Sequence, residues 1–177
     1  MEKISCVLIE KGPEYPKMVL DRIDTGFFDE IIIVEDCPSI YHRYLAAERA
    51  TNNTIYVQDS DCFVNYQVLF KHYNGQITNA MTQPFIDKYK DTGCTLVGWG
   101  CYFDKSMLSV FDRYRAKYGI DDHLLLREAD RIFTAMNRPW NVQVLPHEDL
   151  NQTQDRMGYQ PGHYESMAEA LEKVKSL

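Results

Sequence analysis

The sequence predicts an α/β fold in which helices cover both faces of a mostly parallel sheet. In the first 64 residues, three short apolar runs rich in β-forming residues alternate with helical patterns. Strand, helix, strand, helix, strand with short joints is typical of right-handed βαβ units. Ligands of such sheets bind outside the carboxyl ends of the strands. A site is therefore expected at those ends.

Each element of this first part has its own signal. Residues 4–9 form a continuous apolar run, as expected of a strand covered on both faces. Pro13 or Pro16 can open the next helix, which we expect to end at 25–26. The other elements expected here are a β-branched strand over 30–36, a helix over 40–50 and a strand over 55–64.

The second part of the chain has weaker signals, and one stretch is unusual. Residues 94–103 predict a strand that contains two glycines around a tryptophan, and glycines inside a strand commonly mark a bulge or a close backbone approach. The remaining elements expected, in chain order, are a short helix over 66–73, turns and short strands over 74–91, helices over 105–119 and 121–137, a strand over 142–145, a polar loop over 146–162 and an amphipathic helix over 165–177.

Size and charge narrow the class of protein. The chain has 177 residues, a net charge of −7 and a pI near 5.2. This length predicts one domain, and the acidic balance argues against an extensive nucleic-acid surface. Five cysteines without a CxxC pair indicate a reducing compartment, and the longest N-terminal apolar run is too short for a membrane span. We expect a cytoplasmic protein, in the host cytoplasm if it is viral.

The stretch Asp59-Ser60-Asp61 carries the main chemical signal. It follows a buried-looking strand, and both acids would point to the same side if the extended backbone persisted. Two carboxylates beside a strand end suit a hard divalent cation that also holds phosphate oxygens. Glu10 and Asp36 end the first two predicted strands, so all four acids are expected at one edge of the sheet.

Four blocks of the sequence resemble small single-domain GT-A glycosyltransferases, particularly viral and phage-type ones. The resemblance is carried by 41–47 and 55–62, with 127–134 and 155–163 similar to later blocks of the same group. It implies a GT-A fold with a nucleotide-binding half (1–64) and an acceptor half (65–177). It also implies a nucleoside-diphosphate-sugar donor (UDP-sugar favoured), Mn²⁺ or Mg²⁺, and a glycan or other hydroxyl acceptor.

The resemblance also assigns roles on the donor side. Asp61 would hold the cation most firmly, with Asp59 beside it, although an acid pair that only caps a turn is the alternative. Ser60 would touch the ribose. The other donor residues implied are Glu10 and Asp36 for the nucleobase and ribose, and Arg156 for the diphosphate; His163 competes with His147 for a third metal position.

Three further positions have both a functional and a structural interpretation. Arg43, in the first turn of its helix, opposes the helix dipole and suggests an anion such as the donor phosphate or Asp59. Asp130 would be the general base of an inverting enzyme, or would position the sugar in a retaining one, or would be a helix-surface acid. Residues 98–100 (Gly98, Trp99 and Gly100) would form the wall under the sugar, or Trp99 would belong to the core.

The same residues also bear on three other classes of function. A phosphatase of the haloacid-dehalogenase kind is discounted, because its Asp-x-Asp follows the first strand and needs a hydroxyl residue where Phe63 stands. A non-catalytic nucleotide-sugar-binding module and a sugar nucleotidyltransferase stay as alternatives. For the latter, residues 10–13 are a poor phosphate loop, and we interpret Lys11 and His42 as surface residues.

Overall fold

The structure is a computed structural model that describes residues 2–89, 91–150 and 162–177. Within these residues, six strands form one sheet and two more form a small separate ribbon. The strands are β1 (Ile4–Ile9), β2 (Glu30–Val34), β3 (Thr54–Asp59), β4 (Cys62–Val64), β5 (Ile77–Met81), β6 (Cys101–Asp104), β7 (Trp140–Val144) and β8 (His147–Asp149).

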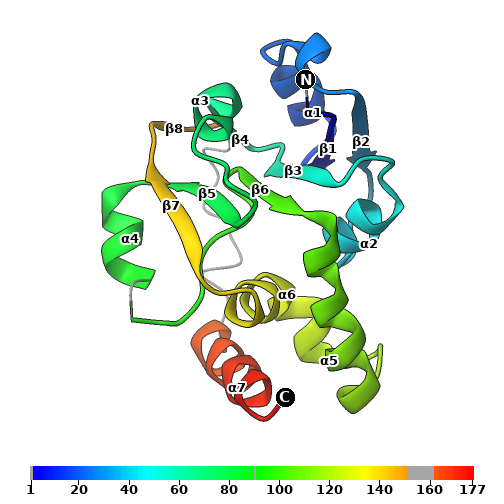
Figure 1. Ribbon diagram of the computed structural model, residues 1–177, viewed down its shortest axis with the longest axis vertical. Coiled ribbons are helices and arrows are strands. Elements are labelled where there is room, and N and C mark those ends of the chain that lie inside the picture. Colours follow the sequence, from blue (N-terminus) through cyan, green and yellow to red (C-terminus); the bar gives the residue numbers. More distant parts are fainter. Residues whose placement is uncertain (1, 90, 151–161) are drawn as a thin grey trace.

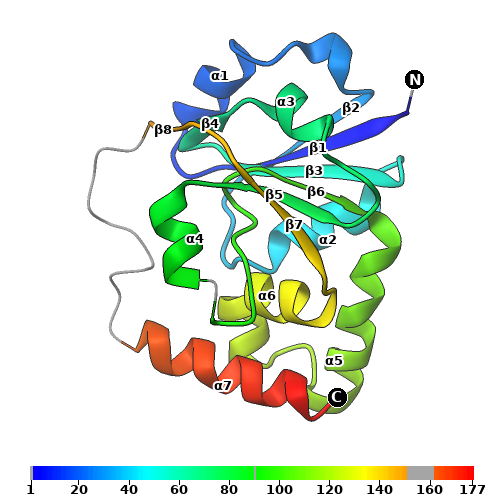
Figure 2. The ribbon, with the colours of Figure 1, turned by 60° about the vertical axis from the view of Figure 1, so that its left-hand side comes forward.

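The helices lie in layers on either side of the sheet, with α1 and α3 over one face and α2, α5 and α6 over the other (Figures 1 and 2). The helices are α1 (Tyr15–Leu20), α2 (His42–Arg49), α3 (Tyr66–Phe70), α4 (Gln83–Tyr89), α5 (Val110–Tyr118), α6 (His123–Met136) and α7 (His163–Lys175), with 3₁₀ turns η1 (Thr25–Phe27) and η2 (Lys105–Ser109). None of the helices in the described part has both the length and the apolar character that a membrane crossing needs.

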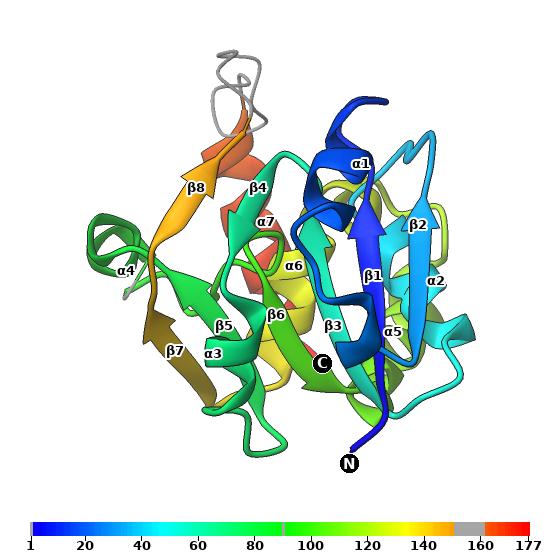
Figure 3. The same cartoon turned by 90° about the horizontal axis from the view of Figure 1, so that it is seen from above.

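The sheet order is β2-β1-β3-β6-β5-β7. β1 runs parallel to both β2 and β3, β6 is antiparallel to both of its neighbours, and β5 pairs in parallel with β7. The carboxyl ends of β1 and β2 therefore point to one edge, which also carries β4 and β8 (Figure 3). The predicted α/β fold with a mostly parallel sheet is confirmed.

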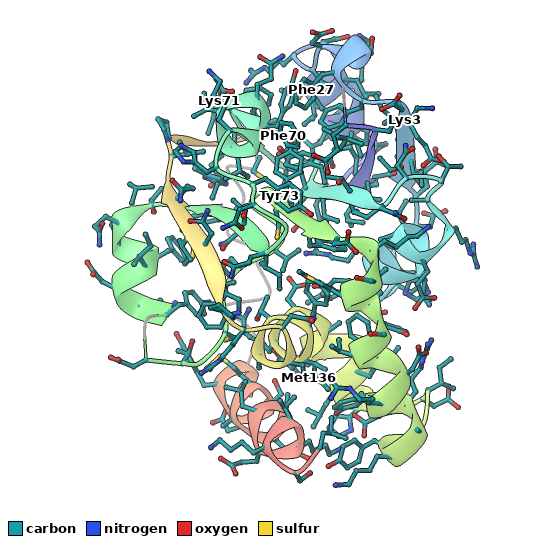
Figure 4. All side chains as sticks on the ribbon, viewed as in Figure 1. Lys3, Phe27, Phe70, Lys71, Tyr73 and Met136 are labelled. Carbon is teal, nitrogen blue, oxygen red and sulfur yellow. The ribbon has the colours of Figure 1, made fainter. Side chains whose placement is uncertain are left out.

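Three apolar clusters hold the described layers together: a small one around Met81, Tyr89 and Cys94, and two larger ones on the two faces of the sheet. On the α1 side, aromatic rings dominate: Phe27 and Phe70 pack edge to face at 5.6 Å, and Tyr73 stacks on Phe70 at 6.1 Å (Figure 4). On the other side, α6 places one apolar face against the sheet, and Met136 at its end packs against the same core. Burial of these faces is the main stabilising term for both layers.

Helix α6 begins and bends at defined residues. Asp122 caps its N-terminus by accepting from the backbone N–H groups of residues 124 and 125, and Glu128 departs from helical geometry in the middle. Lys173 of α7 donates to Asp122 at 2.6 Å, which ties the terminal helix to the start of α6. The kink at Glu128 sets the direction in which the next turn of α6 presents its side chains.

Some element predictions were wrong in extent. The strand expected over 94–103 begins only at Cys101, because residues 94–100 follow an irregular path with a positive φ of 102° at Gly100. Helix α4 lies where turns and short strands were expected, and α1 ends at Leu20, five residues earlier than predicted. The short strand β8 lies inside a stretch predicted to be loop.

Candidate functional site

The Asp59–Asp61 stretch is a turn and not a continuous strand. β3 ends at Asp59, residues 60 and 61 turn, and β4 leaves the main sheet to pair with β8. The extended backbone that would place both acids on one side therefore does not persist. Asp and Ser favour turns because their side chains bond to nearby backbone.

Ser60 joins this turn to the end of β1. Its backbone N–H donates to the Ile9 carbonyl at 2.9 Å, and its fully buried Oγ accepts from the Lys11 backbone N–H at 3.0 Å. The ribose contact expected of Ser60 stays a prediction, and its hydroxyl already has a structural partner. The carboxyl ends of β1 and β3 are thus fastened together.

Asp59 is bound to a buried arginine. Arg43 Nη2 donates to Asp59 Oδ1 at 2.7 Å, and the Arg43 side chain is only 2% exposed. The backbone N–H of Asp59 donates to the Gly98 carbonyl at 2.7 Å. Of the anions expected for Arg43, the structure supplies Asp59.

Asp130 shares the same arginine. Arg43 Nη1 donates to both Asp130 oxygens, at 3.0 and 3.3 Å, and the Tyr44 hydroxyl donates to Oδ1 at 2.7 Å. Asp130 is 8% exposed, so it is not a helix-surface acid. We call Arg43, Tyr44, Asp59 and Asp130 the buried network. It joins the end of β3 to α2 and to the kinked part of α6.

The electrostatics of the buried network follow from its burial. Burial would lower the pKa of Arg43, but the charges of Asp130 and Asp59 outweigh it, so the pKa is raised. Burial and then the Asp130 charge raise the pKa of Tyr44 well above its ordinary value. Arg43 is therefore a fixed cation and Tyr44 a neutral donor throughout the physiological range.

Gly98 allows the chain to pass close to Asp59. A Cβ at this position would lie 2.5 Å from Asp59 Oδ2 and 3.2 Å from Arg43 Nη1. At Gly100 a Cβ would instead meet Val64 and Tyr56, on the other side of the sheet from the buried network. Glycine is thus required at 98 by the candidate site and at 100 by the fold. The sugar-wall role of both stays a prediction.

Trp99 lies half-buried in a stack of rings. Its ring stacks on His147 of β8 at 3.9 Å and meets Phe85 of α4 edge to face at 4.3 Å. β8 pairs with β4, so this stack borders the strand that leaves the acidic turn. Trp99 is therefore not a fully buried core residue. Its contact with a sugar stays a prediction.

Lys11 and Asp61 lie on the outer side of the turn, and we call them the rim. Lys11 Nζ lies 3.6 Å from Asp59 Oδ2, with its side chain 31% exposed. The sequence pattern alone indicates a surface residue at Lys11, whereas its place directly after β1 puts it at the edge where ligands bind. After burial, the charges of Asp59 and Asp61 raise the pKa of the Cys62 thiol, so both acids act on the same turn.

Glu10 and Asp36 line one surface pocket of about 560 Å³ at the carboxyl ends of β1 and β2. Asp36 adopts a positive φ of 47°, and the Glu10 backbone N–H donates to the Val34 carbonyl at 3.0 Å. The other lining residues come from 33–35 and from the segment that contains α1: Pro13, Pro16, Lys17, Leu20, Asp21, Ile33 and Glu35. The structure thus brings these two predicted residues together.

Two predicted ligands fall outside the described part of the chain. Arg156 lies in 151–161, and His163 begins α7 with a side chain that is not described. Across the remaining residues, no group of three or more His, Cys, Asp or Glu side chains is placed to hold a metal ion. His147 is among these residues, and its ring packs on Trp99.

The carboxylate oxygens at the turn would suit a divalent metal ion that binds together with a phosphate-containing ligand. Asp59 already faces Arg43 and Lys11, whereas Asp61 lies on the half-exposed outer side. Mg²⁺ is usually held by one or two carboxylates together with substrate phosphates. Asp61 with two phosphate oxygens is such a set, and the ion would depend on a bound diphosphate.

Comparison with known proteins supports the fold. No protein-family model and no curated protein matches the chain. Among solved structures, 4-diphosphocytidyl-2C-methyl-D-erythritol synthase from Anaerococcus prevotii is similar over 98% of this chain and 99% of its own, with a TM-score of 0.54 and 13% identity. A glycosyltransferase involved in glycosylation of the major capsid of PBCV-1 is similar over 99% and 100%, with a TM-score of 0.51 and 10% identity. The predicted GT-A-like fold is confirmed, and at these identities the likeness shows the fold alone.

Proposed function

We propose that this protein is a metal-dependent glycosyltransferase that moves a sugar from a nucleoside-diphosphate sugar to an acceptor hydroxyl. The observation that carries the proposal is the acidic turn at the carboxyl end of β3, fastened to β1 beside the pocket of Glu10 and Asp36. A nucleotide laid across this edge would place its base in the pocket and its diphosphate at the rim. UDP-sugars are the donors to test first, because the sequence resemblance favours them.

The residues would divide the work as follows. Asp61 would hold Mn²⁺ or Mg²⁺, which would offset the charge that develops on the leaving diphosphate. Glu10 and Asp36 would accept hydrogen bonds from the base and ribose. Trp99 would offer a half-buried face on which a sugar ring can pack.

For Asp130 we propose a positioning role and not that of a free general base. Both of its oxygens accept from Arg43, and one also accepts from Tyr44. A base must have an oxygen within hydrogen-bond reach of the acceptor hydroxyl. Asp130→Asn should therefore raise KM and lower stability together. Loss of kcat with unchanged KM and stability would instead identify Asp130 as the base.

A second candidate, sugar nucleotidyl transfer, is favoured by one observation. Lys11 lies directly after β1 and beside Asp59, where such an enzyme needs a cation for a triphosphate. The solved synthase with the similar fold is compatible with this candidate.

One pair of assays separates the two candidates. With Mn²⁺, the wild type is given either nucleoside-diphosphate sugars with a hydroxyl acceptor mixture, or nucleoside triphosphates with a sugar phosphate. Release of nucleoside diphosphate in the first assay supports glycosyl transfer. Release of pyrophosphate in the second supports nucleotidyl transfer. Nucleotide binding with neither product would leave the binding-module alternative.

A further inference from the structure

Lys11 carries an ammonium group that forms an ion pair with Asp59 but donates no hydrogen bond to the described residues. Its Nζ lies 3.6 Å from Asp59 Oδ2, which is an ion-pair distance but longer than the 2.7–3.2 Å typical of an N–H···O hydrogen bond. Within the described residues, no hydrogen bond from this ammonium is formed. All three N–H donors are therefore available to a ligand.

The backbone of Lys11 is nevertheless fixed. Its N–H donates to the buried Ser60 Oγ, so the residue is joined to the acidic turn itself. Asp59 does not need Lys11 as its main partner, because Arg43 already donates to it at 2.7 Å. A tethered lysine with unused donors at the carboxyl ends of β1 and β3 is suited to an anion bound outside the sheet.

Lys17, on α1, is a useful comparison, because its ammonium group already has a hydrogen-bonded partner. Its Nζ donates to both oxygens of Asp21, at 2.7 and 3.0 Å, and its side chain is 78% exposed. It also lines the pocket of Glu10 and Asp36. Lys17 therefore shares the neighbourhood of Lys11 but already has a partner for its ammonium.

We propose that Lys11 binds the diphosphate of the nucleotide and acts as a resident cation, so that part of the nucleotide affinity needs no divalent ion. The proposal rests on the proposed function and names the residue that receives the phosphates. Lysine binds phosphate as a compact point charge with several donors. The buried Arg43 is not available for this task, because it is 2% exposed and donates to Asp59 and Asp130.

The test measures binding by calorimetry for UDP, GDP, CDP and ADP, each with Mn²⁺ or with EDTA. The proteins are the wild type, Lys11→Met, Lys11→Arg and the matched control Lys175→Met, an exposed lysine of α7 that pairs with Glu172, each first checked for an unchanged thermal midpoint. The wild type should keep measurable affinity for its preferred diphosphate in EDTA. Lys11→Met should weaken it about 10- to 100-fold, the loss expected for charged hydrogen bonds. Lys11→Arg and Lys175→Met should bind nearly as well as the wild type, and binding of the phosphate-free nucleoside should not change.

The outcomes are distinguishable. Equal diphosphate affinity of the wild type and Lys11→Met would overturn the role of Lys11 and leave the proposed function standing. Wild-type binding that vanishes completely in EDTA would overturn the resident-cation claim. Binding of no diphosphate in either condition would overturn both the proposed function and this inference.

Discussion

The buried network and the rim meet at the same three-residue turn, yet they are built differently. In the network, Arg43 is enclosed between Asp59 and Asp130, and Tyr44 supplies a further donor. At the rim, the Lys11 ammonium donates no hydrogen bond to any residue that the structure describes, and Asp61 is only half-buried. Asp59 therefore takes part in the buried ion pairs, whereas Asp61 lies outside the buried network. Two acids in one short motif need not share one task.

The largest expected effect comes from removing the central cation. Arg43→Met would leave the buried Asp130 and the partly buried Asp59 without their main cation, and breaking a buried pair in this way costs about 3–5 kcal/mol. Urea unfolding should show this loss. Arg49→Met, on the exposed end of the same helix, is the control and should change stability by less than about 0.5 kcal/mol.

A triple variant tests why Arg43→Met lowers the free energy of unfolding. Replacing Arg43, Asp59 and Asp130 together by Met, Asn and Asn removes the uncompensated charges, so part of the lost stability should return. A triple variant less stable than Arg43→Met would show that the network stabilises by more than charge balance.

Gly98→Ala should have the next largest effect. The new methyl group would lie 2.5 Å from Asp59 Oδ2, and Asp59 cannot move away without losing Arg43. Overpacking of this kind costs about 1–3 kcal/mol. In a double-mutant cycle, Asp59→Ala should make room, so the two costs should not add. Additive costs would mean that the close approach to Asp59 is not the cause.

Tyr44→Phe tests the network donor with a smaller change. Losing the hydroxyl bond to Asp130 should cost about 1–3 kcal/mol at neutral pH. Because the folded-state pKa of Tyr44 is raised above its ordinary 10.0, its hydroxyl stabilises the fold below that pH, and this contribution is lost as the pH rises toward the folded-state pKa. The variant should therefore lose less stability than the wild type between neutral pH and alkaline pH. Identical pH profiles would contradict this.

The smallest stability effect is expected at the rim. Asp61→Asn should change the free energy of unfolding less than Asp59→Asn does, because Asp61 is half-buried and lies outside the buried network. Asp59→Asn should cost several times more, because it leaves Arg43 with Asp130 alone. Equal costs for the two variants would remove the distinction between network and rim.

The contrast between the halves of the chain shows how far sequence patterns reach. β1, α2 and β3 were predicted because their apolar periods are local and their ends carry turn residues. The irregular path of 94–100 was not, since it depends on the close packing of Gly98 against Asp59 and of Gly100 against Tyr56. Helix α4 was also missed, although Pro84 in its first turn is a start signal.

The sequence predicted which residues belong to the candidate site better than it predicted the contacts between those residues. The sequence placed Asp59, Asp61, Glu10 and Asp36 at strand ends, and the structure puts all four beside the carboxyl ends of β1, β2 and β3. That Asp130 would share Arg43 with Asp59 could not be predicted, because the contact spans 87 residues and depends on the kink at Glu128. Helical spacing indicates on which face of a helix a side chain lies, but it does not indicate which residue of another element that side chain contacts.

The most direct test of the central claim is thermal unfolding with a panel of nucleoside-diphosphate sugars, with and without Mn²⁺, for the wild type and Asp61→Asn. Binding at a hundredfold excess over Kd should add about 2.7 kcal/mol. We predict stabilisation of the wild type by donors of one nucleotide, larger with Mn²⁺, and no Mn²⁺-dependent increment in Asp61→Asn. Equal stabilisation of both proteins would show that Asp61 is not the metal residue. No stabilisation of the wild type by any donor would contradict the proposed function.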